Sequence, residues 1–81
     1  MEETVRSLSA DISLSKRELD VLRLLSQGLS NRQIATSLTL SQNTIKLHVA
    51  SIFFKLSVGN RTEAVTTAVR RGIIVLDETV S

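Results

Sequence analysis

The sequence predicts an all-α domain of four helices, two of which form a helix-turn-helix unit. Four stretches carry apolar residues at spacings of three and four, which is the period of a helix that buries one side. A serine or an asparagine precedes each stretch and can cap its first turn. About three residues join the second stretch to the third, and helices with so short a link cross steeply.

Length and composition indicate a small protein without disulfides or a membrane span. Its 81 residues include no cysteine, which excludes disulfides and thiolate metal sites. No apolar run approaches the roughly 20 residues of a membrane-spanning helix, and residues 1–6 are too acidic and polar for a signal peptide. We therefore expect a cytoplasmic protein that does not associate with membranes. Residues 1–13 are interpreted as a linker or leader, residues 14–76 as the folded domain, and residues 77–81 as a tail.

The charged residues are unevenly distributed, although the net charge is only +2. No aspartate or glutamate occurs between Val21 and Thr62, whereas cations are scattered through the same stretch. An acid-free central block suits a polyanionic partner, but chance in a small chain explains the charge pattern equally well. The cations of this block are Arg23, Arg32, Lys46, Lys55 and Arg61.

The first helix is expected between Leu14 and Gly28. Ser15 and Glu18 have the spacing of a capping box, in which the side chain of each residue accepts a hydrogen bond from the backbone N–H of the other. Leu14 and Leu19 occupy the positions of a hydrophobic staple, which fixes the angle at which the chain enters the helix. Gly28 can adopt the left-handed conformation that commonly ends a helix.

The second helix begins after Ser30, which has the same capping-box spacing to Gln33. Ala35 lies on the inner side of this short helix, and its small side chain permits the close approach of another helix. Only Thr39 and Leu40 then separate the second helix from the residue that can cap the third. The two helices are therefore predicted to form the helix-turn-helix unit.

The third helix is expected at residues 42–56, capped by Ser41, and its two sides differ in character. A narrow apolar stripe is formed by Ile45, Val49, Ile52 and Leu56. The opposite side carries Asn43, Lys46, Leu47 and Ala50, without any acid. A helix that buries one side and offers such groups on the other could read DNA in a major groove. It could also be an ordinary surface helix.

The fourth helix follows Asn60, which has capping-box spacing to Glu63. Ala68 lies on its inner side, and Gly72 is expected to stop it. An apolar run at residues 73–76 comes next. We expect one or two side chains of this run to fold back on Ala68, and the others to form a candidate interface.

The capping residues and apolar positions belong to one motif, which extends from Leu14 to about Ile74. Its residues are 14–18, 22, 28–35, 38, 40–41, 44–46, 48, 52, 55–56 and 60–64. With this spacing the sequence resembles the LuxR/NarL/FixJ-type (GerE-like) helix-turn-helix DNA-binding domain. Glu18, Leu22 and Gly28 stand at hallmark positions of that family.

The resemblance implies the tetrahelical fold of LuxR-type C-terminal effector domains and the activity of a bacterial transcription regulator. It implies sequence-specific binding of duplex DNA by a dimer, with residues 42–56 as the recognition helix in the major groove. Most family members attach this domain to an N-terminal receiver or ligand-binding module. The chain is therefore either an excised effector domain of response-regulator type or a short single-domain member.

Lys46, Leu47 and Ala50 match the positions at which the family usually reads bases. Lys46 can donate a hydrogen bond to guanine O6 or N7, whereas Leu47 and Ala50 can make only apolar contacts, such as with a thymine methyl. Many relatives place Lys or Arg where Ala50 stands, so one direct hydrogen bond to a base is expected to be missing. Asn43 either reads an adenine edge or caps the helix. A solvated surface cation is the alternative for Lys46.

Phosphate contacts are expected near the start of the recognition helix, where helix N-termini attract anions. The residues assigned to them are Arg32, Ser41 and Thr44. Lys55 and Arg61 either add to these phosphate contacts or bind within the protein, to a helix C-terminus or to an acid such as Glu18. Such contacts would position the protein on DNA without selecting a sequence.

The fourth helix makes the symmetric dimer contact in the resembling family, and Val65 and Val69 are assigned to that contact here. Packing within one chain is the alternative for both residues. Phe54 points away from Ile45 and is expected to be exposed, where it could meet a partner.

A second functional interpretation is a protein-interaction module of helix-turn-helix fold that does not bind DNA. Its partners could include polymerase subunits, and a contact with RNA polymerase is compatible with the leading interpretation too. We do not expect an enzyme, a cofactor or a metal, because the chain has one histidine, no cysteine and no phosphate-binding loop.

Overall fold

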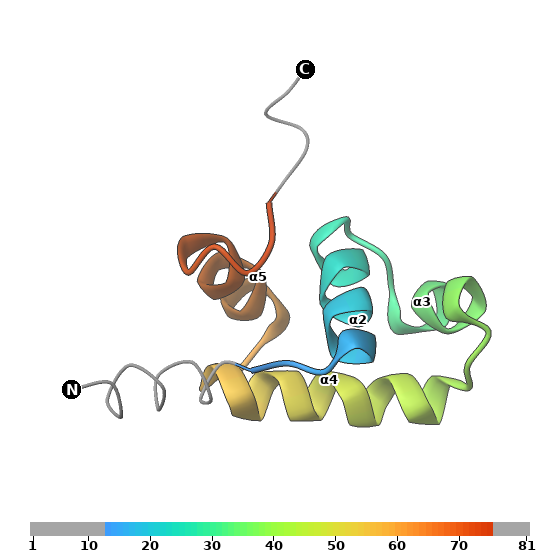
Figure 1. Cartoon of the computed structure of the whole chain (residues 1–81). Helices are drawn as coiled ribbons and strands as arrows, with labels where there is room; N and C mark the ends of the chain where they lie inside the picture. The colour runs from blue at the N-terminus through green and yellow to red at the C-terminus, as the bar shows by residue number, and fades with distance from the viewer. Residues whose placement is uncertain (1–12, 76–81) are drawn as a thin grey trace, which may run out of the picture.

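The computed structural model describes residues 13–75, which form four α-helices and no strand (Figure 1). The helices are α2 (Lys16–Ser26), α3 (Asn31–Leu38), α4 (Gln42–Leu56) and α5 (Arg61–Arg70). The predicted all-α fold of four helices is therefore confirmed. Residues 1–12 and 76–81, which hold most of the predicted leader and the whole predicted tail, lie outside the described residues.

Helix α4, with 15 residues, is the longest of the four and supports the other three. Helices α2, α3 and α5 all contact α4, and in Figure 1 they lie on the same side of it. In the same view α3 lies at the N-terminal end of α4, α2 stands across its middle and α5 lies towards its C-terminal end. This arrangement leaves the opposite side of α4 uncovered within residues 13–75.

The hydrophobic core receives side chains from all four helices. On α4, Ile45, Ile52 and Leu56 are buried and Val49 packs against the core, so the predicted apolar stripe faces inward. Ala35 is buried where α3 packs beside α4, as its small size suggested. The buried apolar residues are Val21, Leu22, Leu25, Ile34, Ala35, Ile45, Ile52, Leu56, Ala64, Ala68 and Ile74.

The first two helices begin with the predicted capping boxes. The N–H of Glu18 donates to Ser15 Oγ over 3.0 Å, and the N–H of Ser15 donates to Glu18 Oε1 over 2.9 Å. The N–H of Gln33 donates to Ser30 Oγ over 3.1 Å, and the N–H of Ser30 donates to Gln33 Oε1 over 2.9 Å. Both boxes satisfy backbone donors that a helix cannot satisfy by itself.

The capping box predicted at Asn60 forms only in part. The N–H of Glu63 donates to Asn60 Oδ1 over 2.9 Å, but Glu63 Oε1 accepts from the N–H of Gly59, over 2.8 Å. The backbone explains this difference, because φ is −156° at Asn60 against −67° at Ser15 and −77° at Ser30. The more extended backbone of Asn60 turns the N–H of Asn60 away from the Glu63 carboxylate and brings the N–H of Gly59 towards it.

The helices end where the sequence predicted, but only two of the ends are formed by the expected glycines. Gly28 and Gly72 have φ values of 90° and 74°, in the left-handed region that glycine adopts without strain. Thr39 and Ser57, which end α3 and α4, also have left-handed backbones, with φ values of 59° and 58°. The next N–H closes the turn in both cases, as when Leu40 donates to the carbonyl of residue 35 over 2.9 Å.

The apolar run after α5 returns to the core, as predicted. The N–H of Ile73 donates to the carbonyl of Ala68 over 2.8 Å, and Ile74 is only 4% exposed. Ile73 packs against the core, whereas Val75 is 81% exposed. Among the described residues, the exposed part of this run is therefore a single valine.

Candidate nucleic-acid interface

The uncovered side of α4 carries all four residues that were assigned to base contacts. Asn43, Lys46, Leu47 and Ala50 are all exposed, and Leu47 is 71% exposed. Their spacings of three and four residues place them on one side of the helix, opposite the buried stripe. No carboxylate occurs on α4 itself. The face therefore offers a cation, an amide and two apolar groups to a partner.

The start of α4 is held by two hydroxyl groups that were assigned to phosphate contacts. Ser41 Oγ accepts from the N–H of Thr44 over 3.1 Å and donates to Thr44 Oγ1 over 2.9 Å. Ser41 is exposed and Thr44 is half-buried. This N-terminus has no acidic residue in its first turn, so the positive end of the helix dipole is not neutralised there.

Arg32 lies on α3, close to the same end of α4. It is exposed and lines an open hollow together with Thr36, Thr39 and Gln42. None of the ion pairs found within residues 13–75 includes Arg32 or Lys46. Both cations are therefore available to an external anion as far as the described residues are concerned.

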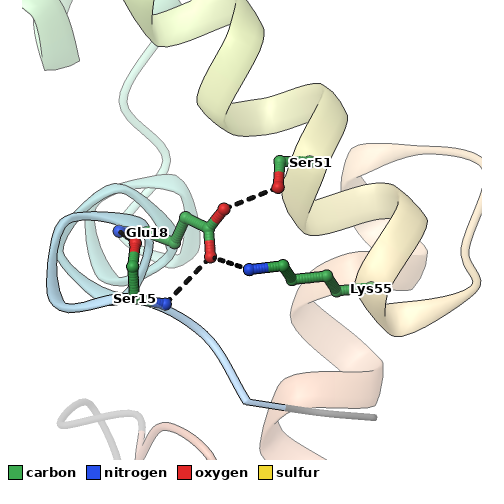
Figure 2. A network of polar contacts seen from close by, with 4 residues as sticks. All are labelled: Ser15, Glu18, Ser51 and Lys55. Atoms are coloured by element: carbon green, nitrogen blue, oxygen red, sulfur yellow. Dashed lines mark hydrogen bonds and ion pairs between the residues drawn. The ribbon is translucent and has the colours of Figure 1, made fainter. Parts of the chain in front are cut away.

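Glu18 is a buried carboxylate that joins α2 to α4 (Figure 2). Besides the backbone N–H of Ser15, its Oε1 accepts from Lys55 Nζ over 2.8 Å, and its Oε2 accepts from Ser51 Oγ over 2.6 Å. Ser51 and Lys55 are four residues apart and thus lie on one side of α4. The network fixes α4 against α2 and leaves the uncovered face of α4 unaffected.

The hydrogen bonds around Glu18 outweigh the effect of its burial on its pKa. Burial disfavours the charged form and would raise the pKa, but the hydrogen bonds from Lys55, Ser51 and Ser15 and the charge of Lys55 lower it from 4.5 to about 2. Glu18 is therefore ionised at neutral pH, and its charge is compensated within the fold.

Lys55 and Arg61 both bind within the protein, the alternative that the sequence left open. Lys55 forms the ion pair with Glu18, and the guanidinium of Arg61 donates to the carbonyl of Leu29, in the loop between α2 and α3. Ser51 was not predicted from the sequence to take part in this network. Its only available signal was its position one turn before Lys55, on the side of α4 that meets α2.

The residues assigned to the dimer contact lie on α5. Val65 is half-buried and Val69 is 38% exposed. An open hollow on α5 is lined by residues that follow α4 and by residues of α5, including Val58, Thr66 and Arg70, but neither Val65 nor Val69 lines it. Val69 is therefore more exposed than Val65, and the dimer contact itself stays a prediction.

Two other kinds of site are not found in the described part of the chain. Residues 13–75 contain no group of three or more histidine, aspartate or glutamate side chains that could hold a metal ion. No helix within these residues has the length and hydrophobicity that crossing a bilayer requires.

Comparison with known proteins identifies a family. Residues 12–68 match the GerE family, described as bacterial regulatory proteins, luxR family. The chain is 46% identical over 65 residues to the HTH-type transcriptional regulator AlkS of Ectopseudomonas oleovorans, a match that covers 80% of this chain and 7% of AlkS. It is 51% identical over 51 residues to the nitrate/nitrite response regulator protein NarP of Escherichia coli, with coverage of 63% of this chain and 24% of NarP.

A longer match is found with the transcriptional regulatory protein YdfI of Bacillus subtilis, 36% identical over 75 residues, which are 93% of this chain and 35% of YdfI. Among solved structures, the response regulator ChrA of a heme-sensing two-component system is similar, with a TM-score of 0.75 and 40% identity. That similarity covers 91% of this chain and 39% of ChrA. The chain therefore spans a minor part of the length of each of these proteins.

Proposed function

We propose that this chain, which belongs to the luxR family of bacterial regulatory proteins, regulates transcription by binding duplex DNA in a sequence-specific manner. The family comprises DNA-binding transcription regulators and not enzymes. The observation that carries the proposal is the uncovered, acid-free face of α4, which lies opposite three packed helices. In this proposal α4 enters the major groove. The protein acts in the cytoplasm, where bacterial DNA lies.

Lys46, Asn43, Leu47 and Ala50 contact base edges in this proposal. Lys46 donates to guanine O6 or N7, and Asn43 pairs with an adenine edge. Leu47 and Ala50 supply apolar contacts and no hydrogen bond. Because only one of the four residues is a cation, we expect modest discrimination by each chain, with DNA shape contributing part of the preference.

Phosphate contacts come from Arg32, Ser41 and Thr44 at the N-terminal end of α4. The unneutralised helix N-terminus and the exposed guanidinium of Arg32 support this assignment. Lys55 and Arg61 bind protein acceptors, and of the two alternatives left open by the sequence we therefore assign them to the support of the fold and not to phosphate contacts.

A homodimer through α5 is the proposed DNA-binding form. The exposed part of Val69 supports this proposal, and Val65 would complete the contact at its edge. A two-fold axis would place the two α4 helices about one DNA turn apart, roughly 34–36 Å, so a bound site would be palindromic. A contact with RNA polymerase stays a prediction from the sequence.

Unbiased selection of bound duplexes at low salt tests the proposed function. We expect enrichment of one palindromic sequence, and binding that weakens linearly in the logarithm of the salt concentration. Arg32→Ala should weaken binding to all duplexes alike and reduce the magnitude of the salt slope by about 1. If a folded, helical sample enriches no duplex, the proposal is wrong and the protein-interaction module takes its place.

A further inference from the structure

Two large apolar side chains are exposed on the uncovered face of α4. Leu47 is 71% exposed and Phe54 is 85% exposed, and the exposed Ala50 lies between them. At about 100° per residue these three positions lie on one side of the helix. From here on, the apolar stripe means the exposed residues Leu47, Ala50 and Phe54, and not the buried stripe on the other side of α4. Phe53 packs against the core, so its neighbour Phe54 is directed outward by the helix itself.

The surroundings of the apolar stripe suit a polyanion that also presents apolar groups. Lys46 and Asn43 adjoin its N-terminal end, and no acidic residue lies between Val21 and Thr62. Lys55, which follows Phe54, is held by Glu18 and does not extend into this face. The C-terminal end of the stripe is therefore apolar, and it continues the same line as the residues that we assign to base contacts.

The major groove presents one apolar group on its base edges, the C5-methyl group of thymine. Against any other base edge, the apolar stripe would bury hydrogen-bond donors and acceptors without giving them partners, which costs free energy. The geometry of the stripe thus favours duplexes with thymine methyl groups beneath it.

We propose that the apolar stripe reads thymine methyl groups at two places, one beneath Leu47 and Ala50 and the other beneath Phe54. This inference rests on the proposed function and names the class of DNA site that it requires. A helix rises about 1.5 Å per residue, so Leu47 and Phe54 lie about 10 Å apart along the axis. For a helix lying along the groove, this distance corresponds to about three base-pair steps of roughly 3.4 Å.

Replacement of thymine by deoxyuridine in the selected duplex tests the inference, because it removes the methyl group and leaves base pairing intact. Each methyl group removed beneath the stripe should weaken binding about fourfold, the change that corresponds to burial of one methyl-sized group. Thymines outside the α4 footprint should tolerate the replacement, and they provide the internal control.

Variants of the 81-residue chain then connect each methyl group to one side chain. Phe54→Ala should weaken binding about tenfold and abolish the effect of deoxyuridine at one place only, whereas Leu47→Ala should abolish it at the other. Phe54→Leu should retain most of the affinity. The salt slope should be unchanged in all three variants, because none of them removes a phosphate contact. Both side chains are exposed, so these variants should keep their helical circular dichroism.

Distinct results would overturn this inference. If deoxyuridine leaves the affinity for the selected duplex unchanged, the stripe does not read methyl groups, although the proposed function stands. If Phe54→Ala weakens binding to thymine and deoxyuridine duplexes equally, Phe54 contacts something else. If this variant alters self-association in sedimentation and not DNA affinity, a second copy of the chain covers Phe54. Failure to select any duplex would contradict the proposed function itself and this inference with it.

Discussion

Glu18 is the one buried charged residue among residues 13–75, and it joins α2 to α4. It belongs to a capping box at the start of α2 and to an ion pair and a hydrogen bond with α4. A buried carboxylate is costly unless hydrogen bonds and a countercharge compensate it. Ser15, Ser51 and Lys55, the three partners of Glu18 drawn in Figure 2, provide that compensation.

The lowered pKa of Glu18 predicts acid sensitivity. Its pKa is about 2 in the folded chain against 4.5 as the ordinary value, so ionised Glu18 stabilises the fold above pH 4.5. That stabilisation, about 3 kcal/mol at most, should disappear as the pH falls from 4.5 through 2. Urea unfolding at a series of pH values measures the effect.

Glu18→Gln separates this effect from that of the other acids. The variant should be less stable than the original chain at pH 7, and the difference should shrink towards pH 2 as Glu18 itself becomes protonated. A difference that stays constant from pH 7 to pH 2 would show that ionisation of Glu18 does not contribute.

Lys46 and Lys55 lie on the same helix but should differ in their effect on stability. Lys55→Met removes the countercharge of a buried carboxylate and should lower the free energy of unfolding by about 1–3 kcal/mol. Lys46→Met changes an exposed side chain and should alter the free energy of unfolding by less than about 0.5 kcal/mol. Urea unfolding at pH 7 compares the two variants, and equal stabilities would contradict the assignment of Lys55 to the fold.

The sequence could name Ser15, Glu18 and Lys55 of this network but could not establish the contact between Glu18 and Lys55. It identified Glu18 by its spacing to Ser15, and it left the partner of Lys55 open. Pairing between α2 and α4 depends on how the two helices cross, and no local pattern contains that angle. Ser51 was missed for the same reason, because a serine within a helix has no distinctive spacing of its own.

At the scale of the elements, the capping contacts at helix starts were more predictable than the backbone conformation at helix ends. Ser15, Ser30 and Ser41 each accept from the N–H three residues later, as their positions indicated. A start is encoded by a side chain that makes a hydrogen bond. The end of a helix depends on the backbone conformation of the residue that follows it. Glycine is the residue type that usually indicates a left-handed backbone there. The left-handed backbones of Thr39 and Ser57 were therefore not predicted, although the helices were expected to end there.

The left-handed backbone of Thr39 predicts a stabilising substitution. A β-branched residue is disfavoured at a φ of 59°, and glycine is not. Thr39→Gly should therefore raise the free energy of unfolding by about 0.5–1 kcal/mol, measured by urea unfolding.

Thr36→Gly is the matched control, because Thr36 is an exposed threonine within the same helix. It should lower the free energy of unfolding by about 0.5 kcal/mol, since glycine disfavours a helix interior. Loss of stability in both variants would mean that the conformation of Thr39 is not strained.

At the scale of the whole molecule, the fold exposes one side of one helix. Three helices cover α4 from the same side, so the inward stripe that includes Ile45 and Ile52 determines which residues face outward. Apolar residues recur at every third or fourth position of α4, and this spacing made the division into an inner and an outer side predictable. The return of Ile74 to the core was predicted only as one or two residues of a run, because several neighbouring side chains were equally apolar.

The burial of Ile74 weakens the alternative interpretation of the chain as a protein-interaction module. The apolar run after α5 was expected to hold a candidate interface, and among the described residues only Val75 of that run is largely exposed. Within residues 13–75, most of the exposed large apolar surface lies instead on the uncovered side of α4, at Leu47 and Phe54. The function of the molecule is therefore to be sought on α4.

The most direct test of DNA recognition by α4 compares two lysines of the chain. Lys46 lies on the uncovered face of α4, whereas Lys16, also exposed, lies at the start of α2. Lys46→Ala should reduce discrimination between the selected duplex and an unrelated one by about 1–3 kcal/mol, and Lys16→Ala should leave it unchanged. Equilibrium binding at fixed salt measures both. Unchanged discrimination in Lys46→Ala, with duplex binding retained, would contradict the account.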